Sequence, residues 1–187
     1  MRNRDFAGAA MAFGRGAAIE PDNPVHLHGA AVAARRLGDY ATAEDNYRAA
    51  IALAENLPGN DDANVTAMAV SLVDLYRGQG RFEDAERLCI WILGCDRSRV
   101  APGRVHVCLG EIYRKQGRFA DAERAFRAAL EDRRASFGDQ HPKTVQLFPR
   151  LASLCRIMGR EGEADDLSRQ AVAAFNVQQQ IRAAGHA

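Results

Sequence analysis

The feature that most constrains this chain is a nine-residue string that occurs twice with a single change. It reads QGRFEDAER over residues 79–87 and QGRFADAER over residues 116–124. Two looser copies lie elsewhere in the sequence. The glycines of the four copies are spaced 42, 37 and 42 residues apart: Gly38, Gly80, Gly117 and Gly159. Such self-similarity is typical of stacked repeat arrays, in which each unit packs only on its neighbours. The sequence therefore predicts a repeat array.

Each unit is predicted to be two helices joined by a tight turn. In the third unit, residues 104–115 place Leu109, Gly110 and Tyr113 on one helical face. Gly117 would end this helix, because glycine accepts the left-handed conformation that helix C-termini commonly need. A second helix from Phe119 to about Ala135 carries a stripe of aromatic and small residues: Phe119, Ala122, Phe126 and Ala129. The small residues would let the two axes approach, with aromatic rings filling the space around the contact.

The same positions recur in the other units. The first unit has Ala31, Gly38, Tyr40, Ala43, Tyr47 and Ala50. The second has Val73, Tyr76, Gly80, Phe82 and Ala85, and the fourth keeps Leu151, Ala152, Gly159, Ala164 and Ala171. The pattern resembles the tetratricopeptide repeat, and the resemblance covers nearly the whole chain. Its two long intervals are similar to the long-period variety of kinesin light chains and many bacterial proteins. That variety usually has paired asparagines in its first helices, which this chain lacks, so a kinesin-type cargo groove is not implied.

The resemblance implies an all-α fold, a right-handed superhelical solenoid of antiparallel helix pairs. Residues 1–23 would form a leading half-repeat, a second helix without its first. Four repeats would follow over residues 24–60, 61–99, 100–138 and 139–187, the last with a C-terminal helical extension. Asn60, Asp61 and Asp62 are candidate N-caps, and Pro142 suits a first helical turn. Pro149 should kink or restart the first helix of unit four.

Composition narrows the classes of function. The formal net charge is +1, which argues against attraction to nucleic acid or an anionic membrane. No apolar run approaches the roughly 18 residues that a membrane span needs. The apolar segment 6–14 is better explained as a second-helix stripe than as a secretory signal. The four cysteines lack a C-x-x-C pair and are expected to be small buried residues in a reducing compartment. We therefore expect a cytoplasmic protein, and the Ala, Arg and Gly content suggests a bacterial one.

Enzymatic chemistry has little support in the sequence. His26 and His28 are two residues apart, so a helix would point them to different sides. His106 and His141 have no obvious acid–base partner, and no nucleophile motif or phosphate-binding glycine loop is present. The carboxylates of the second helices are interpreted as a solvated face. We expect no catalytic residue, no metal site and no cofactor.

The resemblance implies that first helices line a concave groove in which a partner protein or peptide binds. The predicted groove carries eight basic and two acidic residues: Arg35, Arg36, Asp74, Arg77, Arg104, Glu111, Arg114, Lys115, Arg150 and Arg156. We hypothesise that it takes an acidic, carboxylate-bearing peptide through bidentate arginine contacts. The alternative is that these long side chains only solvate a helical face, several of them complementing the helix dipole at C-termini.

A second hypothesis concerns the leading half-repeat. Its apolar residues Phe6, Met11 and Phe13 would lack the cover of a preceding helix. Exposed apolar patches on soluble proteins tend to be interaction sites. The chain would then be a self-assembling scaffold, a homo-oligomer built head to tail through its ends.

Overall fold

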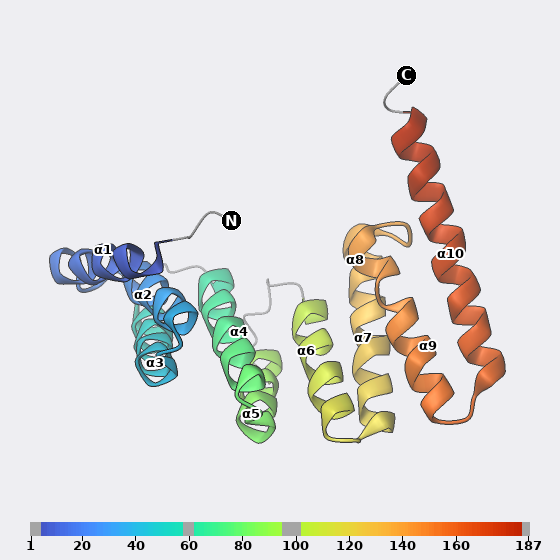
Figure 1. Cartoon of the computed structure of the whole chain (residues 1–187), viewed down its shortest axis with the longest axis horizontal. Helices are drawn as coiled ribbons and strands as arrows, with labels where there is room; N and C mark the ends of the chain where they lie inside the picture. The colour runs from blue at the N-terminus through green and yellow to red at the C-terminus, as the bar shows by residue number, and fades with distance from the viewer. Residues whose placement is uncertain (1–4, 58–61, 95–101, 185–187) are drawn as a thin grey trace. The chain divides into compact units, whose positions relative to one another are not determined.

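The computed structural model describes residues 5–57, 62–94 and 102–184, which form helices joined by short turns (Figure 1). No strand occurs among these residues. The chain divides into two compact units, Met1–Val100 and Ala101–Ala187. The all-α prediction is confirmed.

Unit 1 contains the leading half-repeat and the first two helix pairs. Its helices are α1 (Phe6–Ile19), α2 (Pro24–Leu37), α3 (Tyr40–Asn56), α4 (Asp62–Gly78) and α5 (Phe82–Gly94). Each helix packs on the next one along the chain, as α1 on α2 and α3 on α4. The candidate caps Asn60 and Asp61 lie outside the described residues.

Unit 2 contains the last two pairs, with the first helix of the final pair divided. Its helices are α6 (Pro102–Lys115), α7 (Phe119–Phe137), α8 (Pro142–Val145), α9 (Phe148–Ile157) and α10 (Glu161–Ala184). Pro142 begins α8, and Pro149 lies in the first turn of α9. Because proline has no N–H to donate, it is tolerated there and not in a helix interior. The predicted restart at Pro149 is confirmed.

The turn within each pair depends on a left-handed glycine. Gly38, Gly80, Gly117 and Gly159 have φ values of 85°, 74°, 75° and 76°, a conformation that costs other residues energy. The residue after the glycine then donates its N–H to a carbonyl five positions back, as Arg81 does to Tyr76 at 2.9 Å. This bond satisfies an orphan carbonyl at the helix end. The repeated turn predicted from the sequence is therefore present in all four copies.

The core of the third helix pair contains a close contact between a small residue and an aromatic ring, and the first pair has the same residue types at these positions. In unit 2, a Cβ added to Gly110 of α6 would lie 2.6 Å from the ring of Phe126 on α7. In unit 1 the buried Ala31 and Tyr47 hold the corresponding positions. Ala122 and Ala129 are fully buried in the same cluster as Phe126. The predicted close approach of the helix axes is confirmed.

The thiols behave as buried apolar groups. Cys89, Cys108 and Cys155 are free and buried, as expected, and burial raises the pKa of the Cys155 thiol. Cys95 lies outside the described residues.

Candidate partner-binding surface

Three residues of the predicted groove meet between α6 and α9 in unit 2. Nη2 of Arg114 lies 2.8 Å from Oε2 of Glu111, one helical turn earlier on α6. Nε of Arg150, on α9, lies 3.5 Å from the other oxygen of the same carboxylate. Glu111 is mostly covered, with 17% of its side chain exposed, whereas both arginines remain more than a third exposed. One carboxylate therefore holds two guanidinium groups at the surface; we call Glu111, Arg114 and Arg150 the arginine cluster.

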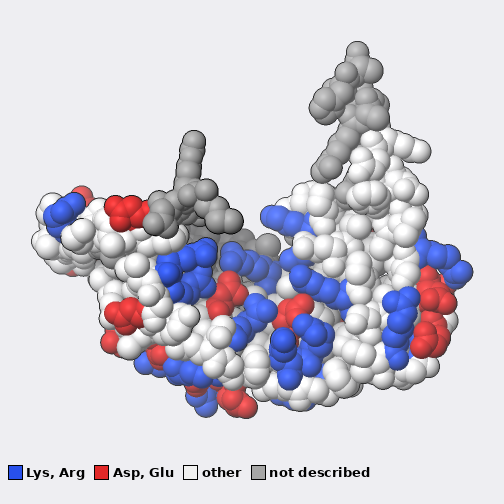
Figure 2. All heavy atoms as spheres, in the orientation of Figure 1, with Lys and Arg blue, Asp and Glu red and all other residues white. Residues whose placement is uncertain are grey.

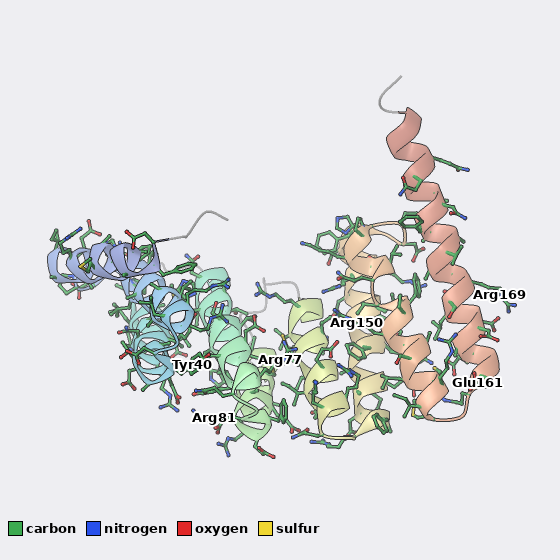
Figure 3. All side chains as sticks on the ribbon, in the orientation of Figure 1. Tyr40, Arg77, Arg81, Arg150, Glu161 and Arg169 are labelled. Carbon is green, nitrogen blue, oxygen red and sulfur yellow. The ribbon has the colours of Figure 1, made fainter. Side chains whose placement is uncertain are left out.

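The surroundings of the arginine cluster add positive charge. Arg133, on α7, has its pKa lowered by burial and then by the nearby Arg150. The guanidinium of Arg150 also lies 6.0 Å from the centre of the Phe126 ring (labelled Arg150 in Figure 3), within cation–π range. Basic side chains gather over this part of the face around a small acidic patch (Figure 2). Sequence reasoning missed Arg133, because it belongs to a second helix, which was expected to face away.

The other predicted residues of unit 2 are not brought into this cluster. Arg156 reaches instead to α10, where its Nη2 lies 3.1 Å from Ser168 Oγ and 3.4 Å from Asp165. Arg104 and Lys115 occupy opposite ends of α6. The predicted face is therefore not one continuous basic stripe, and its basic residues concentrate where Glu111 gathers two of them.

In unit 1 the predicted residues form a second, smaller polar group on α2 and α4. Asp74 and Arg77 pair on α4 at 3.0 Å. Arg35 is half-buried, and the guanidinium of Arg36 lies 5.9 Å from the ring of Phe6. The Asp74–Arg77 ion pair lies within one helix, whereas in the arginine cluster one carboxylate holds arginines of two helices.

His28 links the same two helices of unit 1. Its Nε2 lies 3.1 Å from Ser71 Oγ, and its ring is 5.5 Å from that of Tyr47. Burial, followed by Arg35, lowers the pKa of His28. His26 turns the other way and lies 3.0 Å from Glu20, so the two histidines do point to different sides. The hydroxyl of Tyr47 is buried without a hydrogen-bond partner in the described part of the chain.

The predicted self-association residues lie on α1, and two of them pack against α2. The Phe13 ring covers Gly29, where an added Cβ would lie 2.5 Å from it. Phe6 is half-buried under Arg36, whereas Met11 is 62% exposed. Of the three predicted residues, only Met11 is largely exposed, and the role of these residues in association stays a prediction.

The expectation that His106 lacks an acid–base partner is wrong. Its Nδ1, on α6, lies 2.7 Å from Oδ2 of Asp132 on α7. The pair is separated by 26 residues, so only the packing of the two helices brings it together. His141 Nδ1 accepts a bond from the Lys143 amide and forms an N-cap. Both histidines thus have contacts that hold helices and turns in place.

A second group could be mistaken for a metal site. Single ligand atoms of Glu123, Cys155 and Glu163 lie within 4.8 Å of one another. Both carboxylates, however, are paired with Arg127 and Arg160. A cation would have to displace two guanidinium groups and ionise a thiol whose pKa burial has raised. The group is better explained as an ion-pair network.

Comparisons with known proteins identify the repeat. A family model described as tetratricopeptide repeat matches residues 24–88 and 103–176. BtubC (BKLC) from P. vanneervenii is 21% identical, covering 90% of this chain and 70% of that one, with a TM-score of 0.75. A putative kinesin light chain from Podosopora anserina is 16% identical, covering 96% and 91%, with a TM-score of 0.76. MamA from Desulfovibrio magneticus RS-1 is 14% identical, covering 95% and 89%, with a TM-score of 0.72. Among curated proteins, none matches this sequence.

At these identities the solved structures establish the fold. Among the described helices, none has both the length and the apolar character to cross a membrane.

Proposed function

The chain belongs to the tetratricopeptide-repeat family, and from that premise we propose that it is a non-catalytic adaptor that holds an acidic partner protein or peptide against its first helices. Tetratricopeptide repeats generally mediate protein–protein interaction and are typically non-catalytic. The single observation that carries the proposal is the arginine cluster of unit 2. We place the protein in the cytoplasm, because free buried thiols suit a reducing compartment.

The arginine cluster is suited to bind a carboxylate. Two guanidinium groups share one carboxylate, so the cluster keeps one uncompensated positive charge. Nε of Arg150 faces Glu111, and in the described part of the chain its two terminal Nη groups form no ion pair. These groups can give a paired contact to an incoming carboxylate. Because Glu111 already holds both arginines, these side chains lose less conformational entropy when a ligand binds than unrestrained arginines would.

The test compares peptide binding to the wild type and to neutral variants. A fluorescently labelled Glu-rich peptide and a Lys-rich peptide of equal length are titrated by fluorescence anisotropy. The substitutions Arg114→Gln and Arg150→Gln remove both charges while keeping hydrogen-bonding side chains beside Glu111. We expect the double variant to bind the acidic peptide at least about tenfold more weakly, which corresponds to roughly 1.4 kcal/mol.

A matched control separates a specific site from bulk charge. Arg124 and Arg169 lie on second helices of the same unit, with 81% and 76% of their side chains exposed. Figure 3 shows Arg169 on the side of α10 away from α9. The variant Arg124→Gln/Arg169→Gln makes the same change in net charge and should retain wild-type affinity. Equal losses in both double variants, or equal binding of acidic and basic peptides by the wild type, would show that the proposal is wrong.

A further inference from the structure

Unit 1 has an apolar groove on its second helices, separate from the first-helix residues discussed above. It lies between α3 and α5, has a volume of about 440 Å³, and its floor reaches down to α4. The apolar lining is Ile51, Ala52, Leu72, Leu88 and Trp91. This volume lies within the range of small-molecule and side-chain binding sites.

Trp91 makes this groove unusual. It is the single tryptophan of the chain, and 37% of it is exposed at the groove wall, next to Ile90 at 54%. A tryptophan buries a large apolar area when it is covered, and it is among the residues most enriched at the energetic centres of interfaces. The groove therefore offers an anchor point for a partner.

Unit 2 shows that the helix packing does not require this apolar wall. The ion pair between Arg81 and Glu44 recurs there between Arg160 and Glu123, both pairs being 37 residues apart in sequence. Ala52 lies eight residues after Glu44, and the residue eight positions after Glu123 is the exposed Glu131. Trp91 lies ten residues after Arg81, and the residue ten positions after Arg160 is the exposed Gln170. The same frame thus carries polar residues in unit 2 and an open apolar groove in unit 1.

Charge is distributed unequally along the groove. At one end three arginines share two carboxylates: Arg48, Arg81 and Arg87 with Glu44 and Asp84. Arg48 and Arg87 are 59% and 77% exposed there. At the other end Glu55 is exposed and forms no ion pair in the part of the chain that the structure describes. Unit 2 reverses both signs, with Asp166 in the position of Arg87 and Arg134 in that of Glu55.

We propose that this groove docks an amphipathic helix of a partner protein. An aliphatic or aromatic side chain of that helix packs between Leu88 and Trp91, its acidic residue lies at the Arg48 end, and its basic residue lies at Glu55. Arg48 and Glu55 are two turns apart on α3, about 10 Å along the axis. A partner helix that lies along the groove matches this distance when its acidic and basic residues are seven positions apart, at i and i+7. The apolar residue then lies between them at i+4.

Trp91 also supplies the assay, because its emission moves to shorter wavelength when the indole ring loses water. The probe is an alanine-based helical peptide of about 16 residues with Glu, Leu and Lys at i, i+4 and i+7. Its control has Ser in place of Leu. We expect a saturable blue shift of the wild-type emission with the Leu peptide, and binding of the Ser peptide at least about tenfold weaker.

Two substitutions locate the binding. Ala52→Glu places in the groove the side chain that unit 2 carries at this position, and should weaken binding of the Leu peptide at least about tenfold. Ala41→Glu adds the same charge to an exposed position of α3 outside the lining, and should leave the affinity unchanged. Circular dichroism confirms that both variants fold.

Three results would overturn the proposal. The first is no emission shift with the Leu peptide up to millimolar concentration, and the second is equal affinity of Ala52→Glu and the wild type. The third is a shift of Trp91 emission with protein concentration alone, which would make a second copy of this chain the occupant. Because the arginine cluster is in unit 2, loss of acidic-peptide binding there would leave this titration unaffected.

Discussion

Arg81 immediately precedes α5, and its Nη1 lies 2.5 Å from Oε2 of Glu44 on α3 (Arg81 is labelled in Figure 3). Arg81 also pairs with Asp84 at 2.7 Å, and Glu44 also pairs with Arg48 at 2.8 Å. The four side chains form an alternating chain of charges, from Arg48 through Glu44 and Arg81 to Asp84, that joins one second helix to the next. The carboxylate of Glu44 is the centre of it, because only 13% of its side chain is exposed.

The same network recurs in unit 2. Arg160 pairs with Glu123 and Glu163, and Arg127 pairs with both carboxylates as well. Glu123 lies 37 residues before Arg160 and four residues before Arg127, which are the same separations as those of Glu44 from Arg81 and Arg48. The network is therefore a property of the repeat, which fixes the distance between consecutive second helices.

Replacing Glu44 by glutamine should destabilise unit 1. The amide keeps the shape but cannot balance Arg81 and Arg48, and Tyr76 loses a charged acceptor at 3.0 Å. We expect the free energy of unfolding to fall by about 1–3 kcal/mol, measured by urea denaturation. The control is Asp166→Asn in the exposed Arg169–Asp166 pair, where we expect a change below about 1 kcal/mol. Equal effects of the two substitutions would contradict a structural role for the network.

The network also predicts how stability depends on pH. Burial raises the pKa of the Glu44 and Glu123 carboxyls, but the hydrogen bonds and charges of the arginines around them, with the Tyr76 hydroxyl at Glu44, together outweigh it. Both pKa values therefore lie below the usual 4.5. A carboxyl with a lowered pKa stabilises the fold fully above its unfolded pKa, and this contribution is lost as the pH falls through the folded pKa. We expect wild-type stability to decline below about pH 4.5. The variant Glu44→Gln/Glu123→Gln should lose less stability over the same interval, and urea midpoints between about pH 3 and 7 give the comparison.

The contact of Gly110 with Phe126 predicts opposite effects for two glycine-to-alanine substitutions. Phe126 is fully buried and cannot move away from a Cβ placed 2.6 Å from its ring. Gly110→Ala should therefore cost about 1–3 kcal/mol through overpacking. Gly14→Ala, in α1, meets nothing within 4 Å and should stabilise by about 0.5–1 kcal/mol, because alanine favours the helix. Thermal melts of both variants test this, and stabilisation by Gly110→Ala would show that the close approach is not as tight as described.

The sequence predicted those features whose cause is local. A left-handed glycine and a proline in a first turn act through their own backbone, so Gly117 and Pro149 could be placed without knowledge of the packing. The close contact of Gly110 and Phe126 was also predictable, because the first unit has the same pair of types in Ala31 and Tyr47. The second and fourth units lack the aromatic residue at this position. The recurrence of the pattern along the chain predicts which helices pack on each other, and one unit alone would not show this.

Contacts that depend on the rotation of each helix were not predicted. The carboxylates of second helices were expected to form a solvated face, but Glu44 and Glu123 are largely covered by arginines. The sequence did contain a pattern that indicates these ion pairs. Arg81 and Arg160 each follow a turn glycine, and a glutamate lies 37 residues before each of them, in the second helix of the preceding repeat. No repeated spacing in the sequence predicts the contact of His106 with Asp132, because this contact occurs in one helix pair alone.

The α1 helix allows folding and association to be tested separately. Phe13 packs on Gly29, so Phe13→Ala should lower stability by about 1–3 kcal/mol, whereas the exposed Met11 can be changed at a cost within about 0.5 kcal/mol. Self-association through α1 therefore predicts that Met11→Glu lowers the concentration-dependent mass measured by light scattering while the thermal melt stays that of the wild type. Phe13→Ala, in contrast, should move the melt itself. A wild-type mass that equals one chain at every concentration would remove the self-association hypothesis and leave Met11 as an ordinary exposed residue.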